Sequence, residues 1–459
     1  MTRAYNHRSA FGCWINDMRN KAMPRENWPY GVLDDQTVES IIGCLELQRQ
    51  AGFNEFCTFG LLVTRDWPVD ISSAVSEDRR QKVNTIIKAA HERGIKLLYG
   101  LGVYSWGFDE IIKNCLEVRG PNPGAMCGSS PEAWCWMQKV IDYILAEFDV
   151  DGFHLEASDQ GRCSCPSCAK QGNVEYYSRL NGITAKYIRS KWPDKILMVN
   201  MCGYIHLDTK IETADMKYLV DLSRHLDYII DPGHRGQFIE EKSRKNFIQS
   251  LQCDYGTSGG IWVYPPQRWN RLRWFLPHTI RTGQHLKQLY EDGGRAVEYY
   301  MGPTVNPGVE VNIAFGGKLL SDVEKDVEKI LAEVVEMLYR PKNSAACVQL
   351  VDIFQRAENA YFDHWTPDDI AEVEKLGIPG ELHPIVYLLG HAPGPAAYLR
   401  KPYMDSGGRT AYKKEMISIL NDIRTIESGI AAKTRVTRIK TCIKNTIWDI
   451  DSCENKTGP

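Results

Sequence analysis

The sequence predicts an α/β protein whose main part is a (β/α)8 barrel, the TIM-barrel fold. Between residues 10 and 312, short apolar, β-branched or aromatic runs alternate with longer stretches whose apolar residues recur at helical spacing. The alternation supplies eight strands and eight helices, the number that closes a TIM barrel. A doubly wound sheet is the structural alternative, but no G-x-G-x-x-G follows the first strand.

Each expected strand is a short apolar run that leads into a polar loop. The expected strands are Phe11–Ile15, Phe53–Phe59, Ile95–Val103, Val150–Ala157, Ile196–Cys202, Leu226–Asp231, Gly260–Tyr264 and Arg295–Met301. The expected helices lie near 36–51, 76–94, 131–148, 173–192, 214–225, 238–250, 270–291 and 321–339. Residues at the expected helix boundaries support this order. Gly52 and Gly94 stand between a helix and a strand, where a left-handed helix cap favours glycine. Ser130 precedes a proline at an expected helix start.

The alternation stops near Lys342, so we expect two domains, with the barrel in residues 1–341 and a helical C-terminal domain in residues 342–459. Helical patterns lie near 344–364, 366–376 and 409–432, and a Gly/Pro-rich stretch at 391–395 interrupts them. These helices either stabilise the barrel or build a homo-oligomer, and the sequence leaves both readings open.

Composition excludes several classes of protein and of partner. The chain of 459 residues is 43% hydrophobic and 25% charged, as in ordinary globular proteins. Its 55 Lys+Arg balance 58 Asp+Glu to a net charge of -3, so we expect neither nucleic acid nor an anionic membrane as a partner. No secretion signal and no membrane-spanning apolar run is apparent, so we expect a cytoplasmic protein.

The active site of a TIM barrel lies at the C-terminal ends of its strands, and here those ends are rich in carboxylates and aromatic residues. Aromatic faces stack on sugar rings, and two carboxyl groups supply the acid, base or nucleophile of glycoside hydrolysis. We therefore expect a substrate-binding surface at this end, built from Trp106, His154, Asn200, Tyr204, His234, Trp262, Tyr264 and Tyr299. The alternative is that these aromatic residues only close the barrel by packing.

Glu156 is the first candidate for catalysis. Strand alternation places it on the same side as His154 and opposite Phe153 and Leu155. A glutamate at the lip of a strand is costly to bury against the helices but useful over the barrel mouth, so we expect Glu156 to be the general acid. Asp159 is either the second carboxylate or a substrate-orienting group, and its alternative is an Asp that caps a turn before Gly161.

Two further carboxylates are candidates for the second catalytic group. Asp231 ends the expected sixth strand and could act on water, although Asp-Pro is also a common way to leave a strand. Glu298 lies in the expected eighth strand and is either a nucleophile or the partner of a barrel arginine.

A cysteine cluster follows the fourth strand. Cys163, Cys165 and Cys168 form a C-x-C-x-x-C pattern, and Cys127 is a candidate fourth ligand from the preceding loop. Thiolates at these spacings can hold a structural Zn²⁺, which is the cofactor we expect, and the closed thiolate set is not that of a catalytic zinc. A disulfide between two of the three and unligated thiols are the alternatives.

From Phe153 to Cys168 the chain resembles TIM-barrel glycoside hydrolases. Family 42 β-galactosidases carry an acid/base Glu at the end of strand four and then a C-x-C-x-x-C zinc cluster completed by an earlier Cys. That resemblance implies the acid/base role for Glu156 and a zinc site at Cys163, Cys165, Cys168 and Cys127. Families 20, 67 and 163, which are β-hexosaminidases, α-glucuronidases and endo-hexosaminidases, carry strand-four segments similar to His154–Asp159.

The chain departs from both groups, and the second carries an Asp-Glu pair where this chain has Ser158-Asp159 or Asp159-Gln160. Family 42 has Asn before the acid/base Glu, where this chain has Leu155, and a nucleophile Glu at strand seven, where Trp262-Val263-Tyr264 has none. The barrel with a helical tail and the Glu298-Tyr299-Tyr300 segment are more similar to families 20, 67 and 163.

The function that we expect is hydrolysis of a glycosidic bond in an oligosaccharide by carboxylate acid/base catalysis, without an organic cofactor. One alternative is a non-catalytic carbohydrate-binding barrel. The other is a metal-dependent barrel isomerase, lyase or hydrolase in which His154, Asp231 and His234 ligate the ion.

Overall fold

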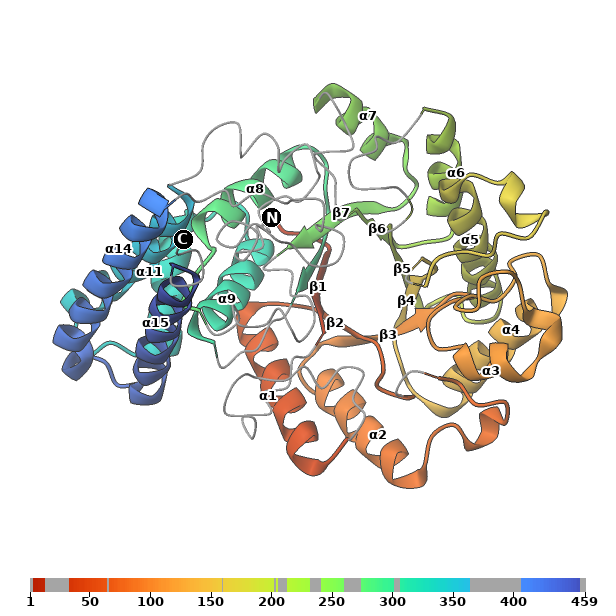
Figure 1. The fold of residues 1–459 in the computed structure, drawn as a ribbon, viewed down its shortest axis with the longest axis horizontal. Helices are drawn as coiled ribbons and strands as arrows, with labels where there is room; N and C mark the ends of the chain where they lie inside the picture. The colour runs from red at the N-terminus through yellow and green to blue at the C-terminus, as the bar shows by residue number, and fades with distance from the viewer. Residues whose placement is uncertain are drawn as a thin grey trace.

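The computed structural model describes residues 3–12, 33–63, 66–158, 160–201, 204, 213–231, 241–259, 274–300, 306–363 and 406–454. Within these residues eight strands form a closed barrel in the order β1 to β8, and every neighbouring pair is parallel. Figure 1 shows the strands at the centre with helices around them. The (β/α)8 fold class is therefore confirmed.

The strands are β1 His7–Phe11, β2 Glu55–Thr58, β3 Lys96–Gly102, β4 Gly152–Glu156, β5 Ile196–Asn200, β6 Tyr228–Ile230, β7 Asp254–Gly259 and β8 Ala296–Tyr300. The helices of the barrel are α1 Asp35–Ala51, α2 Glu77–His91, α3 Asp109–Asn114, α4 Pro131–Glu147, α5 Asn173–Lys191, α6 Thr213–Ser223, α7 Glu241–Ser250, α8 Ile280–Glu291 and α9 Pro307–Ser321. They are followed by α10 Val327–Tyr339, α11 Ser344–Phe362, α14 Ser406–Ile426 and α15 Lys433–Glu454.

Two expected strands are placed wrongly. β1 pairs with β8 from His7 onward, so it shares only Phe11 with the expected Phe11–Ile15. β7 is Asp254–Gly259, which pairs with β6 and β8, and it ends before the expected Gly260–Tyr264 begins. The sequence DYGTSG of β7 has a single large apolar residue, so hydrophobicity alone does not mark it as a strand.

The helix after β8 is α9, which the pattern of apolar residues did not predict. Asn306 caps its first turn by accepting hydrogen bonds from the backbone of Gly308 and Val309, and Pro307 occupies the first helical position. Thirteen of its residues are buried on all sides, so the helix has no polar face and no amphipathic period to detect. The expected helix near 321–339 is α10, which lies outside the strand–helix alternation.

Strand alternation divides the barrel side chains between an inner and an outer layer. The inner layer contains Cys57, Leu98, Met198 and Ile230. The intervening residues, such as Phe153 and Leu155 of β4, pack against the helices in the main core. Residues of the inner layer at the C-terminal ends of the strands therefore face the barrel mouth.

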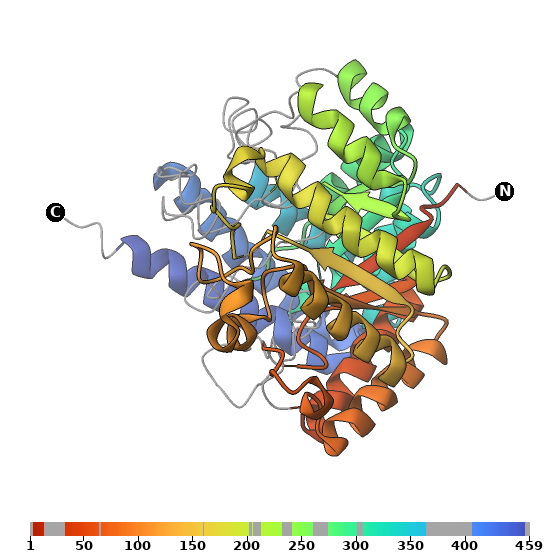
Figure 2. The same ribbon diagram turned by 90° about the vertical axis from the view of Figure 1, so that its right-hand side faces the viewer.

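The C-terminal helices α11, α14 and α15 pack on one side of the barrel beside α9, and Figure 1 shows α14 and α15 in blue. Figure 2 shows the same helices behind the strands, while α5 crosses in front. An ion pair between Arg435 of α15 and the buried Glu310 of α9 connects the two parts, with N–O distances of 2.8 and 2.6 Å. The division into domains at residue 341 remains a prediction.

No helix among the described residues combines the length and the apolar character needed to cross a bilayer.

Candidate active site

Glu156 is the last residue of β4 and lies in register with Gly102 at the end of β3. Its side chain is buried. Ser158 holds the carboxylate in place, since its backbone N–H and its hydroxyl both donate to Oε1 at 2.8 and 2.5 Å. A carboxyl group fixed by two local donors at a strand end has the position that a catalytic acid or base needs.

Beneath Glu156, in the same inner layer of β4, His154 meets Glu298 of β8. His154 Nδ1 is 3.1 Å from Glu298 Oε1 and 3.3 Å from the sulfur of Cys57 on β2. Asn200 of β5 donates from Nδ2 to the other carboxylate oxygen, Oε2, at 2.8 Å. Four strands therefore contribute to one buried polar cluster, which we call the inner cluster and which consists of Cys57, His154, Asn200 and Glu298.

Aromatic side chains separate the inner cluster from the barrel mouth. The ring of Phe59 is 5.0 Å from His154 and 5.0 Å from Trp106, with both contacts edge-on. Phe11 at the end of β1 is 5.5 Å from His154. Trp106 therefore packs on Phe59 at the C-terminal end of the barrel, where it is buried, and its contact with a sugar stays a prediction.

The loop that carries Trp106 has a strained backbone. Tyr104 and Trp106 have φ angles of 64° and 47°, in the left-handed region that side chains other than glycine seldom adopt. The loop is fixed by hydrogen bonds from Met126 N to Tyr104 O and from Trp67 N to Gly107 O, at 2.7 and 2.8 Å. Strain of this kind is concentrated at binding sites, where surrounding contacts maintain it.

Tyr204, which follows β5, is buried beside Glu156. Its ring lies 5.3 Å from that of Tyr177 on α5, and its hydroxyl accepts a hydrogen bond from Asn181. Burial and the charge of Glu156 raise the pKa of Tyr204 well above its ordinary value, and burial with the same charge raises the pKa of Tyr177 to about 12. Both phenols therefore stay neutral and border the carboxylate.

Two expected site residues point away from the barrel mouth. Asp231 follows the inward-facing Ile230, and its carboxylate accepts a hydrogen bond of 3.0 Å from Tyr255, whose ring packs on Phe247 of α7. Tyr299 is buried between β8 and the helices, where its hydroxyl donates to Asn312 O at 3.0 Å. Neither side chain is brought to Glu156, so the structure does not support the catalytic role expected of Asp231 or the sugar contact expected of Tyr299.

Four other expected site residues, Asp159, His234, Trp262 and Tyr264, lie outside the described residues. The alternative metal set, His154 with Asp231 and His234, includes a residue outside the described part of the chain and stays a prediction. His154 lies beside Cys57 and Glu298.

Sequence reasoning missed Cys57, Phe11 and Phe59. All three belong to the inner layer or to the strand ends, where the two-residue period places them on the side of His154. The register between the strands would have placed Cys57 in the same inner layer as His154, and this is the signal that could have identified it.

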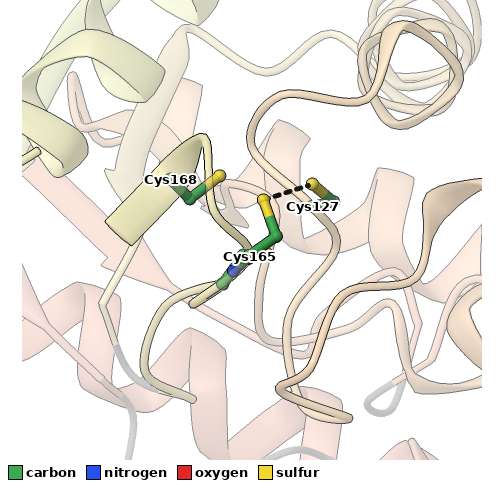
Figure 3. A group of neighbouring side chains, drawn as sticks. Cys127, Cys165 and Cys168 are labelled. Carbon is green, nitrogen blue, oxygen red and sulfur yellow. Dashed lines mark hydrogen bonds between the residues drawn. The ribbon is translucent and has the colours of Figure 1, made fainter. Parts of the chain in front are cut away.

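The four cysteines of the expected zinc site converge. Their sulfur atoms all lie within 4.8 Å of one another, and Figure 3 shows those of Cys127, Cys165 and Cys168 directed at each other. The Cys127–Cys165 separation of 3.7 Å is close to the distance of about 3.8 Å between two thiolates on tetrahedral zinc with bonds near 2.3 Å. All four are free thiols rather than disulfides.

The surroundings of the cluster suit thiolate ligands. Hydrogen bonds from the backbone of Cys168 and from Ser129 lower the pKa of the Cys165 thiol to about 6. Burial raises the pKa values of Cys163 and Cys168. Buried thiols are expected to be protonated in this way before a cation binds. Cys127 precedes α4 and the other three lie between β4 and α5, so a bound ion would connect the loops beside Glu156.

Solved structures with a similar fold are enzymes named as glycoside hydrolases. CpGH84B superposes with a TM-score of 0.53 at 11% sequence identity, covering 99% of this chain and 71% of that one. A GH138 enzyme targeting pectin rhamnogalacturonan II superposes with a TM-score of 0.58 at 9% identity, covering 99% of this chain and 59% of that one. This chain thus spans less than two thirds of the second enzyme.

No protein-family model matches the sequence, and no curated protein matches it. At identities near 10% the structural likeness shows the shared fold, and the same barrel carries many chemistries. The resemblance to families 20, 67, 163 and 42 remains a prediction.

Proposed function

We propose that the protein is a glycoside hydrolase that acts on an oligosaccharide, with Glu156 as the general acid. The observation that carries the proposal is a carboxyl group at the end of β4, held by Ser158 in the inner layer and bordered by aromatic side chains. Glu156 would protonate the leaving glycosidic oxygen, and Trp106 would stack on a sugar ring. The shared fold with two glycoside hydrolases supports the reaction class.

Asp159 is the second carboxyl group in this proposal. Asp231 faces the helices, and Glu298 lies beneath Phe11 and Phe59 in contact with His154, so both are remote from a substrate at the barrel mouth. Asp159 follows Glu156 by three residues in the sequence. It would act as the base on water or as the group that positions the substrate.

Hydrolysis of a panel of aryl glycosides tests the proposal. The panel contains galactosides, glucosides, N-acetylhexosaminides and uronides of both anomers, and it is assayed with wild type, Glu156→Gln and Asp159→Asn. On glycosides of weakly acidic phenols, which need a proton to depart, we expect turnover of one sugar by wild type and a loss of about 100-fold or more in Glu156→Gln, because the amide cannot donate the proton. Turnover of these glycosides that survives in Glu156→Gln would contradict the assignment, while binding of sugars without turnover would favour the carbohydrate-binding barrel.

We also propose that Cys127, Cys163, Cys165 and Cys168 hold a structural Zn²⁺, which the sulfur separations support. The ion would fix the loops that flank Glu156 and would take no part in the reaction. Zinc content measured on wild type and on Cys163→Ser tests this proposal, with loss of one ion per chain expected. An unchanged zinc content in the variant would contradict it.

A further inference from the structure

A second group of metal-binding side chains lies inside the barrel, separate from the cysteine cluster. Cys57 of β2, His154 of β4 and Glu298 of β8 bring one ligand atom each, a sulfur, a ring nitrogen and a carboxylate oxygen, within 4.8 Å of one another. The exposed fractions of the three residues are 0%, 2% and 0%. These ligand atoms are of three chemical types, come from three strands and are shielded from water, unlike a cluster of charged side chains at the surface.

Hydrogen bonding does not account for this arrangement. Glu298 Oε1 is 3.1 Å from His154 Nδ1, yet it has no hydrogen-bond partner, because the imidazole is not aligned to donate to it. The same nitrogen is 3.3 Å from the sulfur of Cys57, and one ring nitrogen carries at most one proton. A fully buried carboxylate oxygen without a partner is costly, so the site is incomplete as an ion pair.

The geometry matches a shared cation instead. Zinc bonds of about 2.0–2.2 Å to N and O and about 2.3 Å to S place neighbouring tetrahedral ligand atoms roughly 3.3–3.6 Å apart. The N–O separation of 3.1 Å and the N–S separation of 3.3 Å are each shorter than the tetrahedral value for their atom pair by about 0.2–0.3 Å, so the ligand atoms would move slightly apart to hold the ion. A thiolate and a carboxylate together balance the two positive charges of the ion, and neutral imidazole completes the set.

One neighbour of these side chains has the role of an outer-shell residue, although the other ring nitrogen of His154, Nε2, has no hydrogen-bond partner. Asn200 donates to Glu298 Oε2 at 2.8 Å, which orients the carboxylate and leaves Oε1 directed at His154 Nδ1. Phe11 and Phe59 lie 5.5 and 5.0 Å from His154 and shield it on the side of the barrel mouth.

We propose that Cys57, His154 and Glu298 bind a divalent, thiolate-tolerant cation of the Zn²⁺ type inside the barrel, with water in the fourth position. The ion would tie β2, β4 and β8 together beneath Glu156. Glu298 is then a metal ligand rather than a catalytic carboxylate. The inference does not depend on the sugar specificity or on the cysteine cluster.

Zinc stoichiometry tests this site. The full-length protein is loaded with excess Zn²⁺, freed of unbound metal by gel filtration, and analysed by elemental mass spectrometry as wild type, Cys57→Ala, Glu298→Gln and Cys442→Ala. Cys442 is the matched control, because it is a buried cysteine of α15 that belongs to neither group of candidate metal ligands. We expect Cys57→Ala and Glu298→Gln to hold one zinc ion per chain fewer than wild type, and Cys442→Ala to hold the same number.

Circular dichroism confirms that each variant is folded, and the isosteric Glu298→Gln carries the test if Cys57→Ala does not fold. A zinc content equal to that of wild type in the folded variants would overturn the proposal and leave His154 and Glu298 as an ion pair. A wild-type protein that retains no zinc would overturn it as well. Loss of zinc in Cys163→Ser alone would leave only the cysteine cluster as a metal site.

Discussion

Side-chain direction decides which carboxylates of this chain can act on a substrate. The two-residue period of β4 correctly placed His154 and Glu156 on the inner side of the barrel. The same period, once anchored by the inward-facing Ile230, places Asp231 toward the helices. The sequence therefore predicts which residues of a strand share a side of the sheet. It does not say which of the two sides faces the barrel interior until a partner strand is known.

His7 supplies a prediction about pH and stability. Burial opposes protonation of its imidazole, but the 2.7 Å contact with Glu55 and the charges of Glu55 and Asp254 outweigh it, and the pKa of His7 is raised above 6.5. A folded-state pKa above the unfolded value means that the pair stabilises the protein fully below pH 6.5 and that this contribution is lost as pH rises through the raised pKa. We expect the wild-type advantage in unfolding free energy over His7→Gln to be largest in the acidic range and to shrink as the solution becomes alkaline.

Urea denaturation at several pH values measures this difference. His225, whose pKa is lowered by burial and by nearby cations, is the matched control, and His225→Gln should not reproduce the trend. An advantage over His7→Gln that grows with rising pH would contradict the assignment of the charged pair.

At the scale of elements, the sequence predicted those with a regular apolar period and missed those without one. β7 combines glycines with small polar residues, and α9 is buried on every side. Their identity depends on what they pack against, namely the neighbouring strands for β7 and both the barrel and the C-terminal helices for α9. Tertiary packing of this kind leaves no local periodic pattern.

Gly316 of α9 tests how tightly that helix packs on the barrel. A Cβ at this position would lie 2.4 Å from ring atoms of Tyr299, which is fully buried and bonded to Asn312. We expect Gly316→Ala to lower the free energy of unfolding by about 1–3 kcal/mol, because the ring has no room to move. Chemical denaturation measures the change.

Gly43 of α1 provides the control, since a Cβ there meets nothing within 4 Å. Gly43→Ala should be neutral or stabilising by about 0.5–1 kcal/mol. Equal effects of the two substitutions would mean that α9 does not pack on Tyr299 as described.

At the scale of the whole molecule, the C-terminal helices form part of the packing and hydrogen bonding of the barrel. Glu358 of α11 is buried and caps the first turn of α8, where its carboxylate accepts hydrogen bonds from the backbone of Thr279, Ile280 and Arg281 at 2.7, 3.2 and 2.9 Å. The carboxylate satisfies donors that the helix itself leaves unpaired. The sequence predicted α11 but could not pair it with α8 across 77 residues of chain.

Glu358→Ala should therefore destabilise the barrel and not only the helical region. We expect a loss of about 3 kcal/mol or more, because buried backbone donors lose their acceptor, with one cooperative transition for the whole molecule. Asp352→Ala, on the same helix but 56% exposed, should change stability by less than about 0.5 kcal/mol. A thermal scan in which Glu358→Ala melts the C-terminal helices first, leaving the barrel intact, would contradict this view.

The barrel and the position of Glu156 at its mouth could be read from alternation and strand parity, whereas the inner cluster could not. Cys57, His154 and Glu298 are separated by 97 and 144 residues, and only closure of β8 onto β1 brings them together. Register between distant strands arises from the whole sheet and is absent from any local pattern.

The most direct test of the central claim, that Glu156 is the general acid, is the dependence of kcat/KM on the leaving group. Wild type and Glu156→Gln are compared on aryl glycosides of the preferred sugar whose phenols range from strongly acidic to weakly acidic. If Glu156 donates the proton, the variant loses about 100-fold or more with weakly acidic phenols and little with strongly acidic ones, because only the former need protonation to depart. A loss that is the same for every leaving group would contradict the account and assign Glu156 to substrate binding.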